Sequence, residues 1–165
     1  MTVQLELQGQ EHKKMASGLH SAIAGTIYGH LFMYVMQQQS RPGYVLESSV
    51  TYNFQDGLPK RQPDVSFVSL EKMPAPPDEE LSFAPDLAVE VVSKNDSISE
   101  IEAKVKQYRQ AGTQLIWIVR PGLQIVEIYH PGDLKPTISG INDTLEGEQV
   151  LPGFKLSVKT LFEYK

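Results

Sequence analysis

Apolar residues near the start of the chain recur at steps of three and four positions. This spacing predicts an amphipathic helix over residues 15–39, and the segment Arg41-Pro42-Gly43 ends it. Residues 1–14 are polar, and we expect a flexible N-terminus there. The apolar positions of the predicted helix are Leu19, Ile23, Ile27, Leu31, Tyr34 and Val35.

The pattern then changes to the shorter period of β-strands. Residues 44–54 alternate between apolar and polar, which predicts a strand with one buried face. Residues 63–70 predict a second strand, and residues 86–92 are almost continuously apolar, which is typical of a strand buried on both faces. The segment 72–85 between them is rich in proline and acidic residues, so we interpret it as a loop rather than a second domain.

A second helix is predicted over residues 97–111. Ser97 and Glu100 have the spacing of a capping box at its start, and Gly112 is placed to end it. Its charged and apolar positions are arranged so that one face can pack on a sheet.

The remaining apolar runs, 114–120 and 124–130, predict two more strands, and weaker strand signals follow around Thr137 and Val150. The predicted order is therefore helix, three strands, helix, and then two or more strands. A mixed β-sheet flanked by helices fits this order and belongs to the α/β class. We expect residues 15–165 to form a single domain, which at this size needs no disulfides.

Composition excludes several classes of function. The 165-residue chain has no cysteine, which excludes thiolate zinc sites, disulfide scaffolds and cysteine nucleophiles. The sequence predicts neither a signal peptide nor a membrane span, so we expect a cytoplasmic protein with no membrane partner. The formal net charge of -5 argues against binding nucleic acid through overall charge. It leaves open a local basic groove, or contact with phosphates through bound metal ions.

Glu90 is the residue that least fits its surroundings, because it lies inside the apolar run 86–92. A carboxylate there is costly to bury unless a cation or hydrogen-bond donors meet it. Asp86 shares its face of the strand but lies roughly 13 Å away, so the two cannot hold one small ion. Asp64 begins the preceding strand, and if the two strands are adjacent, Asp64 and Glu90 face each other near one end of the sheet.

Lys104 flanks the buried face of the predicted 97–111 helix and could reach the same place. Two acids and a lysine suit a hydrolytic site with a divalent metal, Mg²⁺ or Mn²⁺. Other interpretations stay open: Asp64 as a turn residue at a strand start, Glu90 in an ion pair without chemistry, and Lys104 as an ordinary surface lysine. Glu47 is either a third acid near the metal or part of a solvated face.

Several segments together resemble the PD-(D/E)XK nuclease superfamily, and more closely the Uma-type family of restriction endonucleases. The resemblance covers nearly the whole chain and includes His20 in the first helix. The matching segments are PDVSFVS, PDLAVEVVS, KVKQYRQAG, QLIWIV and LPGFKLSVKTLF. It implies a restriction-endonuclease-like core with the order α-β-β-β-α-β, extra C-terminal strands and a metal-dependent phosphodiesterase site.

The resemblance also implies roles for particular residues. Asp64 corresponds to the acid of the PD motif and Glu90 to the acid of the (D/E)XK motif. The motif lysine would fall at Val92, so the resemblance implies that Lys104 of the following helix replaces it. His20 corresponds to a histidine of the family's first helix, where it would orient a phosphate or a metal-bound water, or would simply be a satisfied histidine at the helix edge.

We therefore expect an Mg²⁺-dependent endonuclease that hydrolyses DNA phosphodiester bonds, with Mn²⁺ as the alternative ion. DNA is then the partner, and a homodimer would supply two active sites for duplex cleavage. The acidic balance and the missing lysine at position 92 favour an alternative, a catalytically silent nuclease-like module for binding or interaction. A nucleoside or small-molecule hydrolase has less support, because the chain has no glycine-rich phosphate loop and no Gly-x-Ser-x-Gly motif.

Overall fold

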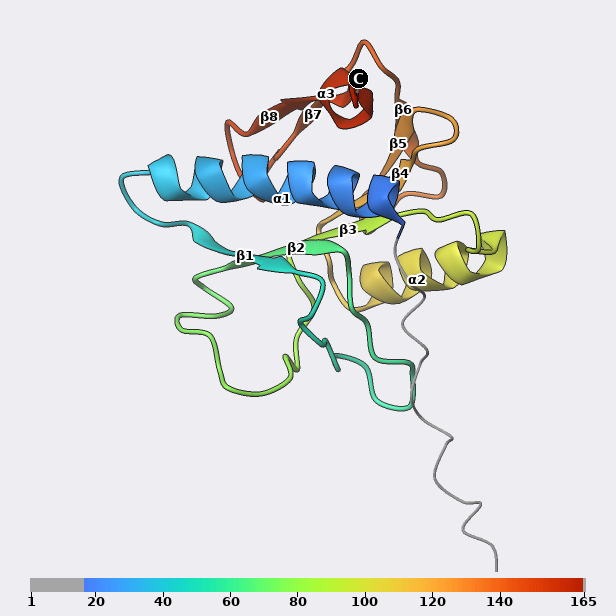
Figure 1. Ribbon diagram of the computed structural model, residues 1–165. Helices are drawn as coiled ribbons and strands as arrows, with labels where there is room; N and C mark the ends of the chain where they lie inside the picture. Colours follow the sequence, from blue (N-terminus) through green and yellow to red (C-terminus); the bar gives the residue numbers. More distant parts are fainter. Residues whose placement is uncertain (1–16, 165) are drawn as a thin grey trace, which may run out of the picture.

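The computed structural model describes residues 17–164 (Figure 1). It confirms the α/β class, with a six-stranded mixed sheet, flanking helices and a small two-stranded sheet. The predicted flexible segment 1–14 lies outside the described residues, and the single domain over 15–165 stays a prediction. The helices are α1 (Gly18–Gln37), α2 (Ile98–Gln110) and α3 (Val158–Phe162). The strands are β1 (Gly43–Glu47), β2 (Val65–Ser69), β3 (Leu87–Val91), β4 (Leu115–Arg120), β5 (Ile125–Tyr129), β6 (Thr137–Ser139), β7 (Thr144–Glu146) and β8 (Lys155–Ser157).

The strands of the large sheet follow one another in sequence order, from β1 to β6. β3 and β4 pair in parallel, and the other neighbours pair antiparallel. A parallel pair needs a crossover connection, which α2 provides. This confirms the predicted order of helix, three strands, helix and strand, with further strands toward the C-terminus.

The sheet is covered on both faces (Figure 1). α1 packs on one face together with the C-terminal segment that carries β7, β8 and α3, and α2 packs on the other face. Side chains of β3 alternate between these two sides: Leu87, Val89 and Val91 belong to the core under α1, whereas Ala88 packs with α2. Glu90 shares the face of Ala88, so its side chain is directed toward α2.

Signals in its own sequence fix where α2 begins and ends. The predicted capping box is present: Ser97 Oγ accepts the N–H of Glu100 at 3.2 Å, and Glu100 Oε2 accepts the N–H of Ser97 at 2.9 Å. Gly112 follows the helix with a φ of 95°, a left-handed conformation that glycine adopts at little cost. The helix is thereby placed over the β3 face that carries Glu90.

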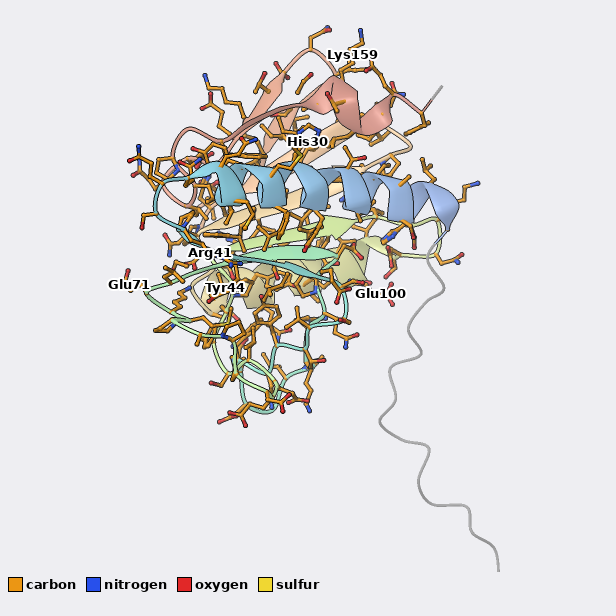
Figure 2. All side chains as sticks on the ribbon, turned by 60° about the vertical axis from the view of Figure 1, so that its left-hand side comes forward. His30, Arg41, Tyr44, Glu71, Glu100 and Lys159 are labelled. Atoms are coloured by element: carbon orange, nitrogen blue, oxygen red, sulfur yellow. The ribbon has the colours of Figure 1, made fainter. Side chains whose placement is uncertain are left out.

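The connection from α1 to β1 depends on close packing. Arg41 Nε donates to the carbonyl of Gly43 at 2.9 Å, and its guanidinium lies 4.2 Å from the centre of the Tyr44 ring (Figure 2). A Cβ at Gly43 would lie 2.2 Å from the carbonyl oxygen of Val68, so only glycine fits.

Among residues 17–164, neither α1 nor any other helix is long and apolar enough to cross a membrane.

The first strand is shorter than predicted. β1 ends at Glu47 rather than Phe54, because the Glu47 carboxylate accepts both the N–H and the hydroxyl of Ser49 and the chain turns there. Beyond the turn, Tyr52 makes isolated bridges to two other segments. The alternating pattern of residues 44–54 therefore covers a strand, a turn and a bridge.

Of the two weak strand signals near the C-terminus, one is confirmed and one is wrong. Thr137 begins β6. Val150 lies in a turn, where its N–H donates to the carbonyl of Gly147 at 3.0 Å. Glu148, in the same turn, has a φ of 49°, which no strand residue adopts. The strands of this region are instead β7 and β8, which pair on either side of the turn.

His130 joins the end of β5 to this turn. Its Nδ1 lies 2.7 Å from Asp133 Oδ2 and its Nε2 lies 2.7 Å from Glu148 Oε2. Partial burial lowers the pKa of His130, but the hydrogen bonds to Asp133 and Glu148 outweigh it and raise the pKa above 6.5. The folded chain therefore binds the proton of His130 more tightly than the unfolded chain does.

We expect His130→Gln to lower the free energy of unfolding in mildly acidic solution by up to about 1 kcal/mol, the scale of exposed ion pairs. Because the folded pKa is raised, the wild-type advantage is fully present below pH 6.5 and is lost as the pH rises through the folded pKa. Urea denaturation of both proteins at about pH 5.5 and about pH 9 checks this. An equal difference at the two pH values would contradict it.

Candidate active site

The two acids predicted to face each other lie on neighbouring strands. The antiparallel register of β2 and β3 pairs Val65 with Val89, and extending it by one residue places Asp64 opposite Glu90. Asp64 Oδ2 accepts the N–H of Val91 at 2.7 Å, which ties Asp64 to the end of β3. Both carboxylates therefore lie where β2 begins and β3 ends.

Glu90 is only 4% exposed, and α2 compensates its burial. Lys104 Nζ donates to Glu90 Oε2 at 3.1 Å, and the Tyr108 hydroxyl donates to Glu90 Oε1 at 2.8 Å. Lys104 and Tyr108 are four residues apart on α2, so they project from the same side of the helix. Each carboxylate oxygen thus has a donor, which is the condition under which a buried charge is tolerated.

Burial and neighbouring charges shift the pKa values of this pair. Burial raises the pKa of Glu90, the Lys104 ammonium lowers it, and the negative charge of Asp64 raises it again, so the net direction is upward. Burial lowers the pKa of Lys104, but the Glu90 carboxylate outweighs it and raises that pKa overall. Lys104 therefore stays protonated at neutral pH and offers a fixed positive charge beside the two acids.

His20 reaches the same place from the other side of the sheet. Its Nε2 lies 3.2 Å from Asp64 Oδ2, and the hydrogen bond to Asp64 is the main cause that raises the pKa of His20. The N-cap of α1 fixes its position, because Ser17 Oγ accepts the N–H of His20 at 3.1 Å. The structure thus brings together four of the five predicted side chains: His20, Asp64, Glu90 and Lys104.

Glu47 is the predicted residue that the structure does not bring into this group. It pairs with Val65 at the end of β1, and that register places it on the face opposite Glu90. Its exposed carboxylate bonds to Ser49. This geometry favours the solvated alternative over a third acid at the site, and the physical reason is the turn that ends β1 two residues after its last buried position, Val45.

The family model whose description reads "Putative restriction endonuclease" (Uma2) matches residues 2–159. The chain belongs to the Uma2 family. No curated protein matches the chain significantly.

A solved structure resembles this Uma2 chain over most of its length. It is described as a "putative nuclease belonging to DUF820" from Anabaena variabilis, has a TM-score of 0.77 and is 24% identical. The match covers 90% of this chain and 82% of the other. At this identity the similarity establishes the fold, a mixed sheet with flanking helices.

Two residues of the candidate site were not predicted as site residues. Tyr108 binds Glu90 directly, but in the sequence it is an ordinary member of the apolar face of α2. Its spacing of four residues from Lys104 is the signal that could have identified it. Asp96 lies in the loop between β3 and α2, and its negative charge contributes to the raised pKa values of both His20 and Lys104. Nothing in the local pattern distinguishes it from a loop aspartate.

The two carboxylates of the candidate site suit a metal ion that needs few protein ligands. Among residues 17–164, no group of three or more His, Cys, Asp or Glu side chains is placed to hold a metal ion. Mg²⁺, however, is usually bound through one or two protein carboxylates and keeps several waters or substrate phosphates. Asp64 and Glu90 are such a pair of oxygen donors, and they could hold an ion of this open type.

We expect Tyr108→Phe to raise the pKa of Glu90 further, because the hydroxyl hydrogen bond is one of the interactions that lower it. The variant keeps the ring that packs on Phe54, so it should fold. It leaves one oxygen of a buried carboxylate without its donor, at a cost of about 1–3 kcal/mol in the free energy of unfolding. Urea denaturation at neutral pH measures this cost, and a loss below a few tenths of a kcal/mol would contradict it.

Proposed function

We propose that the chain is a metal-dependent endonuclease that hydrolyses DNA phosphodiester bonds. The observation that carries the proposal is the convergence of Asp64, Glu90 and Lys104 at the end of β3, where Lys104 Nζ lies 3.1 Å from the buried Glu90 carboxylate. Membership of a restriction endonuclease family supports the same reaction class. A cytoplasmic location, DNA as substrate and a homodimer with two active sites belong to the same proposal.

Each residue then has a distinct role. Asp64 and Glu90 would hold Mg²⁺ or Mn²⁺, and such an ion when bound acidifies a water and stabilises charge on a phosphoryl oxygen. Lys104, kept protonated by Glu90, would orient the attacking water and neutralise charge that develops on the phosphate. His20 would hold Asp64 in place, and as a donor it could also orient a phosphate.

A catalytically silent binding module is the second candidate. Val92 stands where the motif lysine would be, and both Glu90 oxygens are already engaged by Lys104 and Tyr108. If these contacts persist in solution against an added ion, the acids would be structural. The two candidates differ in whether the chain binds a metal at the acids.

Calorimetric titration with Mg²⁺ and Mn²⁺, together with cleavage of supercoiled plasmid, distinguishes them. For an endonuclease we expect metal-dependent cleavage that a chelator stops, and binding heat that is lost in Asp64→Ala. Glu47→Ala is the matched control, because it removes an acid outside the site and should retain both properties. Absence of binding at millimolar metal, with equal residual cleavage in all three proteins, would favour the silent module.

A further inference from the structure

Arg61 lies three residues before Asp64, and its side chain is held against α2. Its Nε donates to Gln107 Oε1 at 2.5 Å, and the Gln107 amide nitrogen donates to the carbonyl of Pro59 at 2.8 Å. Gln107 is 4% exposed, and both the oxygen and the nitrogen of its buried amide are hydrogen-bonded in this arrangement. The backbone of Arg61 is also tied down, because it exchanges two hydrogen bonds with Tyr52.

This position is adjacent to the candidate active site. Gln107 precedes Tyr108, which binds Glu90, and it lies three residues after Lys104, on the neighbouring turn of α2. The Arg61 charge also acts on the Tyr108 hydroxyl, since it opposes the rise in the pKa of that group. Arg61 and Lys104 are thus two cations along one side of α2.

The two cations differ in their partners. Lys104 is paired with Glu90, as Lys60 is with Glu80 and Lys72 is with Asp86. The half-buried guanidinium of Arg61 has no carboxylate within ion-pair distance among residues 17–164, and its terminal nitrogens are not used by Gln107. A fixed guanidinium with unused donors suits an anion of planar or tetrahedral geometry, above all a phosphate.

We propose that Arg61 binds a backbone phosphate of the nucleic acid strand, next to the phosphate held at the candidate active site. The net charge of -5 cannot supply general attraction to DNA, so individual cations in fixed positions must supply it. The inference rests on the proposed function, because it takes the substrate to be a nucleic acid. Arg61 contacts the substrate outside the reacting bond and contributes to binding.

Salt dependence of DNA binding tests the assignment. Fluorescence anisotropy with a short labelled DNA duplex, in chelator so that no cleavage occurs, gives Kd between about 50 and 200 mM NaCl. We expect Arg61→Gln to weaken binding and to reduce the slope of log K against log salt by about 0.9, the value for one phosphate contact. Arg109→Gln is the matched control: it removes an α2 guanidinium that binds the Pro131 carbonyl, and the slope should not change.

A purely structural role gives a different result. If Arg61 only attaches the segment before β2 to α2, Arg61→Gln lowers the Tm but leaves the slope unchanged, and that result overturns the inference while the endonuclease proposal stands. Absence of salt-dependent binding by the wild-type chain in chelator also overturns the inference, whereas the endonuclease proposal is decided separately by the metal-dependent cleavage assay. Arg61→Lys keeps the positive charge but lacks the forked donors of the guanidinium. The slope should therefore equal that of the wild type, while binding stays weaker than wild type at every salt concentration. If Arg61→Gln does not fold, Arg61→Lys decides, and unchanged affinity overturns the inference.

Discussion

Glu90→Gln should abolish DNA cleavage while the chain still folds. The amide has nearly the same shape, and its oxygen can still accept the Tyr108 hydroxyl. It lacks the negative charge that would hold a divalent ion. Such an ion contributes several kcal/mol of transition-state stabilisation. Since each 1.36 kcal/mol is tenfold in rate, we expect the cleavage rate to fall by about 10³-fold or more.

Single-turnover cleavage of a plasmid in Mg²⁺, with near-UV circular dichroism to confirm folding, measures this effect. Asp64→Asn should give a loss of the same order, because it removes the other carboxylate of the pair. Glu47→Gln is the control, since its exposed side chain bonds to Ser49 away from the site. Cleavage by folded Glu90→Gln at the wild-type rate would end the assignment of Glu90.

Lys104→Met should destabilise the fold strongly at neutral pH. The substitution keeps an unbranched side chain but leaves the Glu90 carboxylate buried without its cation. Removal of one partner from a buried ion pair costs about 3–5 kcal/mol. The double variant Glu90→Gln with Lys104→Met removes the uncompensated charge, so it should recover much of that stability.

The sign of the pH dependence provides a second check on Lys104→Met. Burial raises the pKa of Glu90 and Lys104 lowers it, so without Lys104 the folded pKa is higher still. A carboxyl with a raised folded pKa loses stability as the pH rises from its unfolded value of 4.5 through the folded value. In urea denaturation, the free energy of unfolding of the variant should therefore fall more steeply from about pH 4.5 to neutral than that of the wild type. Parallel curves for the two proteins would contradict the assigned ion pair.

The sequence predicted the acids and the lysine because their positions depend on simple periods. Strand alternation separates Glu90 from the apolar side chains of β3, and helix geometry turns Lys104 toward the same sheet face. Tyr108 could be identified only by its spacing of four residues from Lys104, because a tyrosine in an apolar stripe satisfies the apolar pattern whether its hydroxyl is used or not. Asp96 depends on how the loop before α2 folds, which no period records.

The fold was predictable to a similar extent and for the same reasons. Long apolar runs such as β3 and β4, and the capped helix α2, carry strong local signals. The end of β1 was not predictable, because the alternation continues past Glu47 and only the side-chain bonds to Ser49 turn the chain. β7 and β8 are short and depend on pairing with each other across a turn, so local propensity identifies them poorly.

The candidate active site takes its side chains from elements on both surfaces of the sheet: His20 from α1, Asp64 and Glu90 from the strand layer, and Lys104 with Tyr108 from α2. These residues are spread over positions 20–108 of the chain, so a proteolytic fragment that lacks α1 or α2 cannot reproduce the site. Loss of either covering helix dismantles the constellation. Enzymatic turnover would thus report the integrity of the entire tertiary structure, and thermal inactivation would coincide with global melting.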